Sequence, residues 1–80
     1  MIAPMSKSAH QDDYKFLLAC LIEARLDAGL RQIDIAERLS KPQSYVSKYE
    51  QGERRIDVLE FIAITKAIGI DPLWLLKKIL

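Results

Sequence analysis

Four polar side chains recur at helical spacing in one short segment, and their chemistry is hydrogen bonding and charge. They are Gln43, Ser44, Ser47 and Lys48. Val46 and Tyr49 lie three residues apart, so on one helix they would face inward and leave these four on the outer side. An amide, two hydroxyls and an ammonium group can donate hydrogen bonds to another molecule's polar edge. Such a face on an isolated helix is more often simply solvated, so its interpretation as a recognition surface depends on the motif that surrounds it.

Catalysis and metal binding find little support in the rest of the sequence. His10 has no second imidazole or free thiol near it, and Cys20 lies in the apolar run Phe16 to Ile22, where a thiol is usually buried. There is no cysteine–histidine or serine–histidine pairing and no glycine-rich phosphate loop, and the carboxylates fall on helix surfaces or caps. We expect no enzyme activity, no metal and no cofactor.

Length and composition allow one domain outside the membrane. The chain has 80 residues, half of them apolar, which suffices for a single core. The longest apolar run is the seven residues from Phe16 to Ile22, far below the roughly 20 of a membrane span. The single cysteine excludes an internal disulfide, and the start MIAPMSKSAH lacks the apolar region of a signal peptide. We therefore expect a cytoplasmic protein.

The periodicity begins after a polar stretch and predicts a long first helix. Residues 1–11 are aperiodic and are expected to be a flexible tail, which leaves residues 12–80 as the domain. Asp12 or Asp13 can cap a helix that ends at Gly29. Its inward positions are Tyr14, Leu17, Leu18, Leu21, Ala24 and Ala28.

Two short helices follow, joined by a tight turn. The first starts near Gln32, points Ile35, Ala36 and Leu39 inward and ends at Ser40. Pro42 disfavours helix at Lys41 but suits the first turn of a new helix, which we expect over residues 42–51. Gly52 then ends it.

Cap signals delimit two further helices and complete an all-α chain. Asp57 and Glu60 form a capping-box pattern for a fourth helix that ends at Gly69. Its buried stripe is expected to be Val58, Phe61, Ile64, Thr65 and Ile68. Asp71 followed by Pro72 starts a fifth helix. This helix carries Leu73, Trp74, Leu76, Ile79 and Leu80.

The segment QIDIAERLSKPQSYVSKYEQGERR, residues 32–55, resembles the helix-turn-helix of the Cro and phage-repressor (Xre-like) family. The positions that carry the likeness are Gln32, Ala36, Val46, Tyr49, Glu50 and Gly52, and it extends from Arg25 to Gly69. Two residues depart from the pattern. Ser40 stands where the family often has glycine, since the turn there favours a positive φ, and Ile56 stands where the family often has proline. The resemblance implies a five-helix lambda-repressor-like DNA-binding domain with its helix-turn-helix at 32–51, of bacterial or phage origin.

The resemblance assigns DNA contacts to the polar face. The helix expected over residues 42–51 enters the major groove with its amino-terminal end, and Gln43 lies at that end. A carboxamide can pair with adenine N6 and N7. Lys48 can reach guanine or a phosphate. Ser44 and Ser47 can each contact a base edge or a phosphate. The expected phosphate contacts are Gln32, Lys41, Tyr45, Arg54 and Arg55, although Tyr45 is equally suited to covering the core edge. Arg25 and Glu50 match a structural ion pair of the family.

Net charge alone does not decide between binding partners. It is +1 overall, with six basic and four acidic residues between Arg31 and Arg55. We expect a sequence-specific transcriptional regulator, a repressor that binds as a homodimer through its C-terminal helix and takes no small-molecule effector. The antitoxin of a toxin–antitoxin pair, or a protein-interaction module on the same fold, remains an alternative. DNA binding requires a basic surface around Gln43, whereas an interaction module would have an apolar or acidic one.

Overall fold

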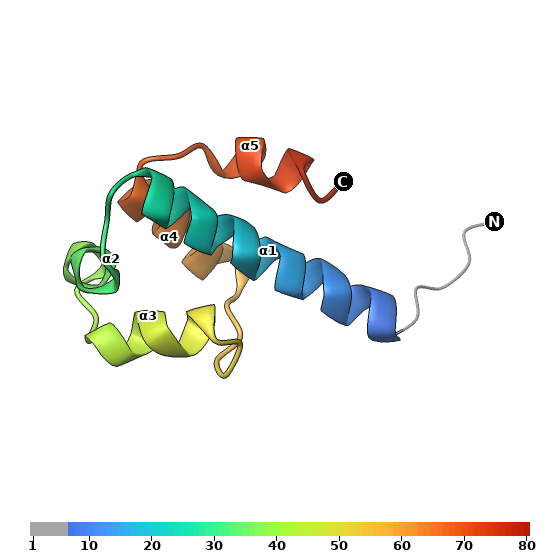
Figure 1. The fold of residues 1–80 in the computed structure, drawn as a ribbon, viewed down its shortest axis with the longest axis horizontal. Coiled ribbons are helices and arrows are strands. Elements are labelled where there is room, and N and C mark those ends of the chain that lie inside the picture. The colour runs from blue at the N-terminus through green and yellow to red at the C-terminus, as the bar shows by residue number, and fades with distance from the viewer. Residues whose placement is uncertain (1–6) are drawn as a thin grey trace.

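Five helices make up residues 7–80, the part of the chain that the computed structural model describes (Figure 1). They are α1 Lys7–Asp27, α2 Gln32–Leu39, α3 Gln43–Glu50, α4 Val58–Ile68 and α5 Pro72–Lys77. There is no strand within this range, so the expected all-α class is confirmed. The first six residues of the expected tail lie outside the described residues.

The first helix begins earlier than the sequence suggested. It starts at Lys7 rather than at Asp12, so Asp12 and Asp13 are exposed positions inside α1 and not its caps. Residues 7–11 contain no glycine or proline, and lysine, alanine and glutamine are good helix formers. A polar, aperiodic stretch can therefore extend a helix whose buried face lies further along, and the prediction of an irregular segment up to residue 11 was wrong from Lys7 onward.

The turn between α2 and α3 has the backbone conformation expected for glycine, but serine occupies it. Ser40 has φ 56° and ψ 42°, and the N–H groups of Ser40 and Lys41 donate to the carbonyls of Glu37 and Ala36. A left-handed residue after a helix satisfies its last carbonyls, and serine adopts it at some cost in strain. Pro42 is the N-cap of α3, not part of its first turn.

The remaining caps are as predicted. Asp57 and Glu60 form a reciprocal capping box at the start of α4, and Gly69 ends that helix with φ 97°. The carboxylate of Asp71 accepts a hydrogen bond from the Leu73 N–H, with Pro72 as the first residue of α5. Each helix end in the second half of the chain is therefore determined locally by its own residues.

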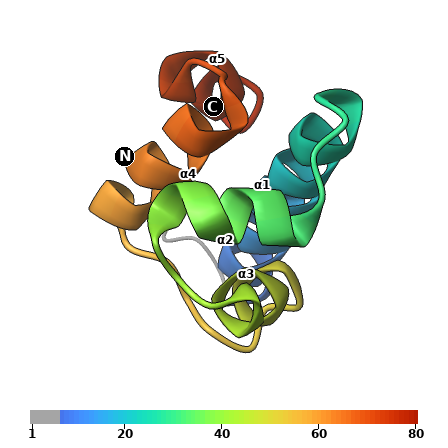
Figure 2. The same ribbon diagram turned by 90° about the vertical axis from the view of Figure 1, so that its left-hand side faces the viewer.

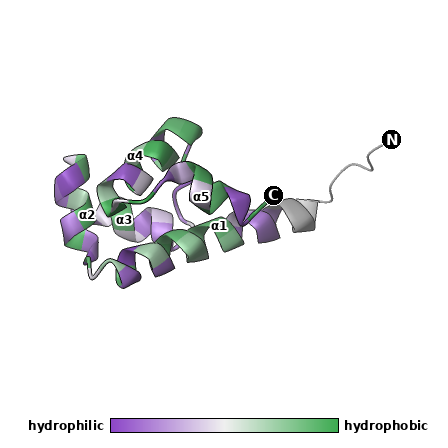
Figure 3. Cartoon of the chain, turned by 90° about the horizontal axis from the view of Figure 1, so that it is seen from above, coloured by the Kyte–Doolittle hydropathy of each residue, from purple (hydrophilic) through white to green (hydrophobic). Residues whose placement is uncertain are grey.

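The core lies where the middle of α1, the inner faces of α2 and α3, and α4 meet (Figure 2). Figure 3 shows α1 alternating between hydrophilic and hydrophobic bands, as expected of a helix with one buried face. The largest side chains with almost no exposed surface are Leu21, Ile35, Val46, Tyr49, Ile64, Thr65 and Leu75. Cys20 is also buried, as predicted. Helices α2 and α3 are thus fixed to the rest of the domain by their apolar sides.

Two positions predicted to be buried are exposed. Val58 is 72% exposed because it lies in the first turn of α4, and Ala28 follows the end of α1. Helix α5 ends at Lys77, so Ile79 and Leu80, which the sequence placed on this helix, follow it. The buried residue of α5 is Leu75, while Leu73 and Trp74 are 63% and 51% exposed. The run PLWLLKKIL is apolar nearly all round, so its periodicity does not reveal which face packs inward.

No helix within residues 7–80 is long and apolar enough to cross a membrane.

Candidate nucleic-acid interface

The polar side of α3 is open to solvent. Gln43, Ser44 and Lys48 are exposed and Ser47 is partly exposed, while Val46 and Tyr49 on the opposite side are buried. Helix α3 lies along the edge of the molecule opposite α5 (Figure 1), and the quarter-turn view shows the same arrangement (Figure 2). The four polar side chains therefore belong to one helix face that a large partner can reach.

A buried ion pair ties the far end of α3 to α1. The Arg25 guanidinium donates to both oxygens of Glu50, with Nε to Oε2 at 2.8 Å and Nη2 to Oε1 at 3.1 Å. Its Nη1 donates to the carbonyl oxygen of Leu30 at 2.9 Å. The two side chains are only 10% and 6% exposed. Such bidentate geometry with further hydrogen bonds fixes the direction of the helix as well as its position.

Gln32 joins the same network at the start of α2. Its amide Nε2 donates to Glu50 Oε1 at 2.8 Å. One of its two amide hydrogens is thus used within the protein, and Gln32 connects the first residue of α2 to the last residue of α3. The amide consequently helps to set the angle between the two helices of the helix-turn-helix.

A second polar cluster ties the near end of α3 to α4. The Tyr45 hydroxyl donates to Glu60 Oε2 at 2.9 Å, and Arg54 Nη2 lies 2.8 Å from the same oxygen. The guanidinium of Arg54 and the ammonium of Lys41 lie 4.7 Å and 5.5 Å from the centre of the Tyr45 ring. The Tyr45 ring also meets Tyr49 edge-on, with centroids 5.6 Å apart. Both ends of α3 are therefore held by polar contacts in addition to the core.

Hydrogen bonds shift the ionisation of this cluster. The Arg54 guanidinium and the Asp57 backbone N–H lower the pKa of Glu60 to about 2. Partial burial, and then the hydrogen bond to Glu60, raise the pKa of Tyr45 to about 12. In another exposed pair, Arg31 lowers the pKa of Asp34 to about 2. Glu60 and Asp34 are therefore ionised and Tyr45 neutral near pH 7.

These lowered pKa values predict acid sensitivity. Because the folded pKa of Glu60 lies below its ordinary 4.5, its contribution to stability is complete above about pH 5 and is lost as the pH falls toward 2. We expect the melting temperature to decline over that window, and less steeply in Glu60→Gln. Melting curves followed by circular dichroism from pH 2 to 7 measure both; equal slopes for the two proteins would contradict the assignment.

Most carboxylates near α3 are already paired. Glu50 points inward to Arg25, Glu60 meets Arg54, and Asp34 meets Arg31 across a pair that is 77% and 24% exposed. Lys41, Lys48 and Arg55 form no ion pair with any residue in the described part of the chain. Three exposed acids also lie near them in sequence: Glu37 in α2, Glu53 in the loop after α3 and Asp57 at the start of α4. The accessible charge on α3 itself is therefore the positive charge of Lys48, because Glu50 is buried against Arg25.

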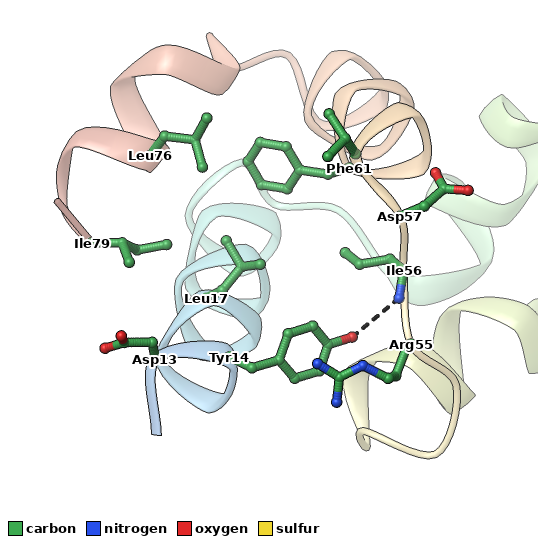
Figure 4. A pocket seen from close by; sticks show the side chains of 10 residues that line it. Asp13, Tyr14, Leu17, Arg55, Ile56, Asp57, Phe61, Leu76 and Ile79 are labelled. Atoms are coloured by element: carbon green, nitrogen blue, oxygen red, sulfur yellow. Dashed lines mark hydrogen bonds between the residues drawn. The ribbon is translucent and has the colours of Figure 1, made fainter. Parts of the chain in front are cut away.

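Two contributors to this site were not recognised as such in the sequence. Glu60 was identified only as a capping residue, and its contact with Tyr45 spans 15 residues without a local signal. Tyr14 was assigned to the core, but its hydroxyl accepts a hydrogen bond from the Ile56 N–H, and Arg55 lies 4.3 Å from its ring centre (Figure 4). The loop between α3 and α4 is thus supported from both sides by tyrosines.

The fold and this site define a helix-turn-helix protein. The helix-turn-helix family model matches residues 21–75. A solved structure, an XRE-family like protein from Pseudomonas syringae pv. tomato str. DC3000, is 49% identical to this chain, with a TM-score of 0.89. The similarity covers 91% of this chain and 89% of that one. No curated protein matches the chain.

The chain therefore belongs to the XRE family of helix-turn-helix proteins, as the sequence resemblance predicted. Members of this family are DNA-binding regulators and not enzymes, so the chain is a DNA-binding regulator at the level of its family. In the described residues, no group of three or more metal-ligating side chains comes together.

Proposed function

We propose that this protein is a sequence-specific transcriptional repressor that inserts α3 into the major groove of duplex DNA. The observation that carries the proposal is the exposed face of Gln43, Ser44, Ser47 and Lys48 on a helix held rigidly at both ends. The major groove, about 12 Å wide, admits an α-helix, and side chains near the helix's amino end are the first to meet base edges. Gln43 is the first residue of α3.

Contacts to the DNA backbone would come from the residues that border α3. Lys41 precedes the helix and the two arginines Arg54 and Arg55 follow it, so basic groups lie beyond both of its ends. Gln32 opens α2, where the helix terminus favours an anion. Each neutralised phosphate should contribute about −0.9 to the slope of log affinity against log salt. An affinity for duplex DNA that is independent of salt would contradict this arrangement.

Gln43 is the residue on which sequence preference should depend. We expect Gln43→Ala to remove about 1 to 3 kcal/mol of discrimination at one base pair of each half-site, because alanine cannot make the bidentate contact to adenine. Selection of bound duplexes from a random pool, carried out with the wild-type protein and the variant, measures this loss. If the variant selects the same sequences as the wild type, Gln43 does not determine sequence preference.

We also propose that two copies bind together, through a lateral groove. An apolar groove of about 300 Å³ runs from the loop at Arg55 and Ile56 to Leu76 of α5 and Ile79 beyond its end, with α1 and α4 as its walls (Figure 4). Val58 in its lining is 72% exposed. The outer side of α5 is opposite α3 (Figure 1), so pairing there would direct the two α3 helices away from each other. Pairing across the groove leaves both free to read half-sites about 34 Å apart on one duplex.

Charge inserted into the groove should break the dimer. Val58→Asp is expected to shift the protein toward monomer in sedimentation experiments and to weaken binding to a duplex with two half-sites, because burying an unpaired carboxylate is costly. Leu73→Asp provides a matched control, since Leu73 is 63% exposed on α5 and does not line the groove. A monomer produced by Leu73→Asp alone would assign the interface to the outer side of α5 instead.

A further inference from the structure

The two arginines of the α3–α4 loop are neighbours in sequence but differ in what holds them. Arg54 pairs with Glu60 Oε2 at 2.8 Å, donates to the carbonyl oxygen of Arg55 at 3.1 Å and stacks on the Tyr45 ring. Arg55 stacks on the Tyr14 ring and forms no ion pair within residues 7–80. The loop therefore directs Arg54 toward α3 and α4, and Arg55 toward α1.

Glu60 uses both of its carboxylate oxygens in this arrangement. Oε1 accepts from the Asp57 N–H at 3.0 Å, which belongs to the capping box of α4. Oε2 accepts from the Tyr45 hydroxyl at 2.9 Å and from Arg54. Tyr45 lies two residues after Gln43, and its ring packs on the buried Tyr49. One carboxylate thus connects the amino end of α3, the loop and the start of α4.

We propose that Glu60 is a positioning residue for DNA recognition: it engages Arg54 and Tyr45 to fix the reading end of α3, and leaves Arg55 as the loop arginine that contacts phosphate. This inference rests on the proposed DNA-binding function and separates two arginines to which the sequence assigned the same role. Tyr45, whose only hydroxyl proton goes to Glu60, then acts through α3 and not as a phosphate donor.

Charge balance supports this separation. Arg54 and Glu60 together carry no net charge, so the pair adds nothing to the release of counterions from DNA. Moving Arg54 to a phosphate would leave the Glu60 carboxylate unpaired beside the DNA, where like charges repel. Arg55 has no acidic partner among the described residues, so its contact with a phosphate leaves no carboxylate exposed.

Salt dependence distinguishes the two arginines. The probe is one 20-base-pair duplex of random sequence, titrated with protein between 50 and 200 mM salt. Arg55→Gln is expected to reduce the slope of log affinity against log salt by about 0.9 per bound chain. The charge-neutral double variant Arg54→Gln with Glu60→Gln should keep the wild-type slope. A reduced slope in the double variant with an unchanged slope in Arg55→Gln would overturn the assignment.

Sequence preference tests the positioning role of Glu60. Tyr45→Phe keeps the ring and removes only the hydrogen bond to Glu60, so the variant should bind the random duplex as the wild type does. Its preference for the selected duplex over the random one should fall about threefold to tenfold, corresponding to one hydrogen bond. A purely structural hydrogen bond would lower the melting temperature and leave that ratio unchanged, which would overturn the proposal. Failure of the wild-type protein to bind either duplex is a separate result and would overturn the proposed function itself.

Discussion

Arg25→Met should destabilise the fold by about 3 to 5 kcal/mol, because it leaves the Glu50 carboxylate buried with its main partner gone. Methionine retains most of the apolar stem, so the loss reports on the charge and its hydrogen bonds. A domain of this size has on the order of 4 to 12 kcal/mol of total stability, so the variant should lose about a quarter of it or more. Urea unfolding followed by circular dichroism measures the difference.

Two further variants separate burial from ion pairing as such. Arg31→Met breaks the exposed pair with Asp34, where the arginine is 77% exposed, and should cost less than about 1 kcal/mol. Arg25→Met combined with Glu50→Gln removes both buried charges and should recover part of the loss, since no unpaired carboxylate remains. If the two single arginine variants are equally stable, the contact between α1 and α3 does not depend on the buried pair.

Local signals in the sequence were sufficient for the helix-turn-helix and for most helix ends. Pro42, Gly69, Asp57 and Asp71 act within a few residues of where they stand, and the structure has a helix boundary at each. The start of α1 was missed because helix formers without an apolar stripe give no periodic signal. Local chemistry therefore determined where helices end better than how far a solvent-exposed helix extends.

Long-range contacts of the site could not be derived from spacing. The pairing of Arg25 with Glu50 spans 25 residues and was expected only from the family resemblance. The contact between Tyr45 and Glu60 was not expected at all, because a capping residue already has a sufficient local role. What the sequence supplied for the site was the outer face of α3. The contacts that orient this face depend on how the helices pack.

The packing of α5 is the clearest case in which the sequence left the buried position undetermined, and it leads to a prediction. Leu75→Ala should cost about 2 to 5 kcal/mol, because the Leu75 side chain has no exposed surface and its removal leaves a cavity. Leucine at 73 has the same chemistry on the same helix but is 63% exposed. Leu73→Ala should therefore change stability by no more than about 0.5 kcal/mol.

The same pair of variants tests whether α5 belongs to the cooperative fold. Loss of Leu75 should free α5 from α1 and α4, and with it Leu76 and Ile79, which form one wall of the groove. Amide hydrogen exchange should then accelerate in residues 72–80 more than in α2 and α3, because regions with few buried contacts open first. The DNA-reading helices would remain folded while the proposed dimer contact is lost. Equal stability of Leu75→Ala and Leu73→Ala would instead mean that α5 is not docked on the core in solution.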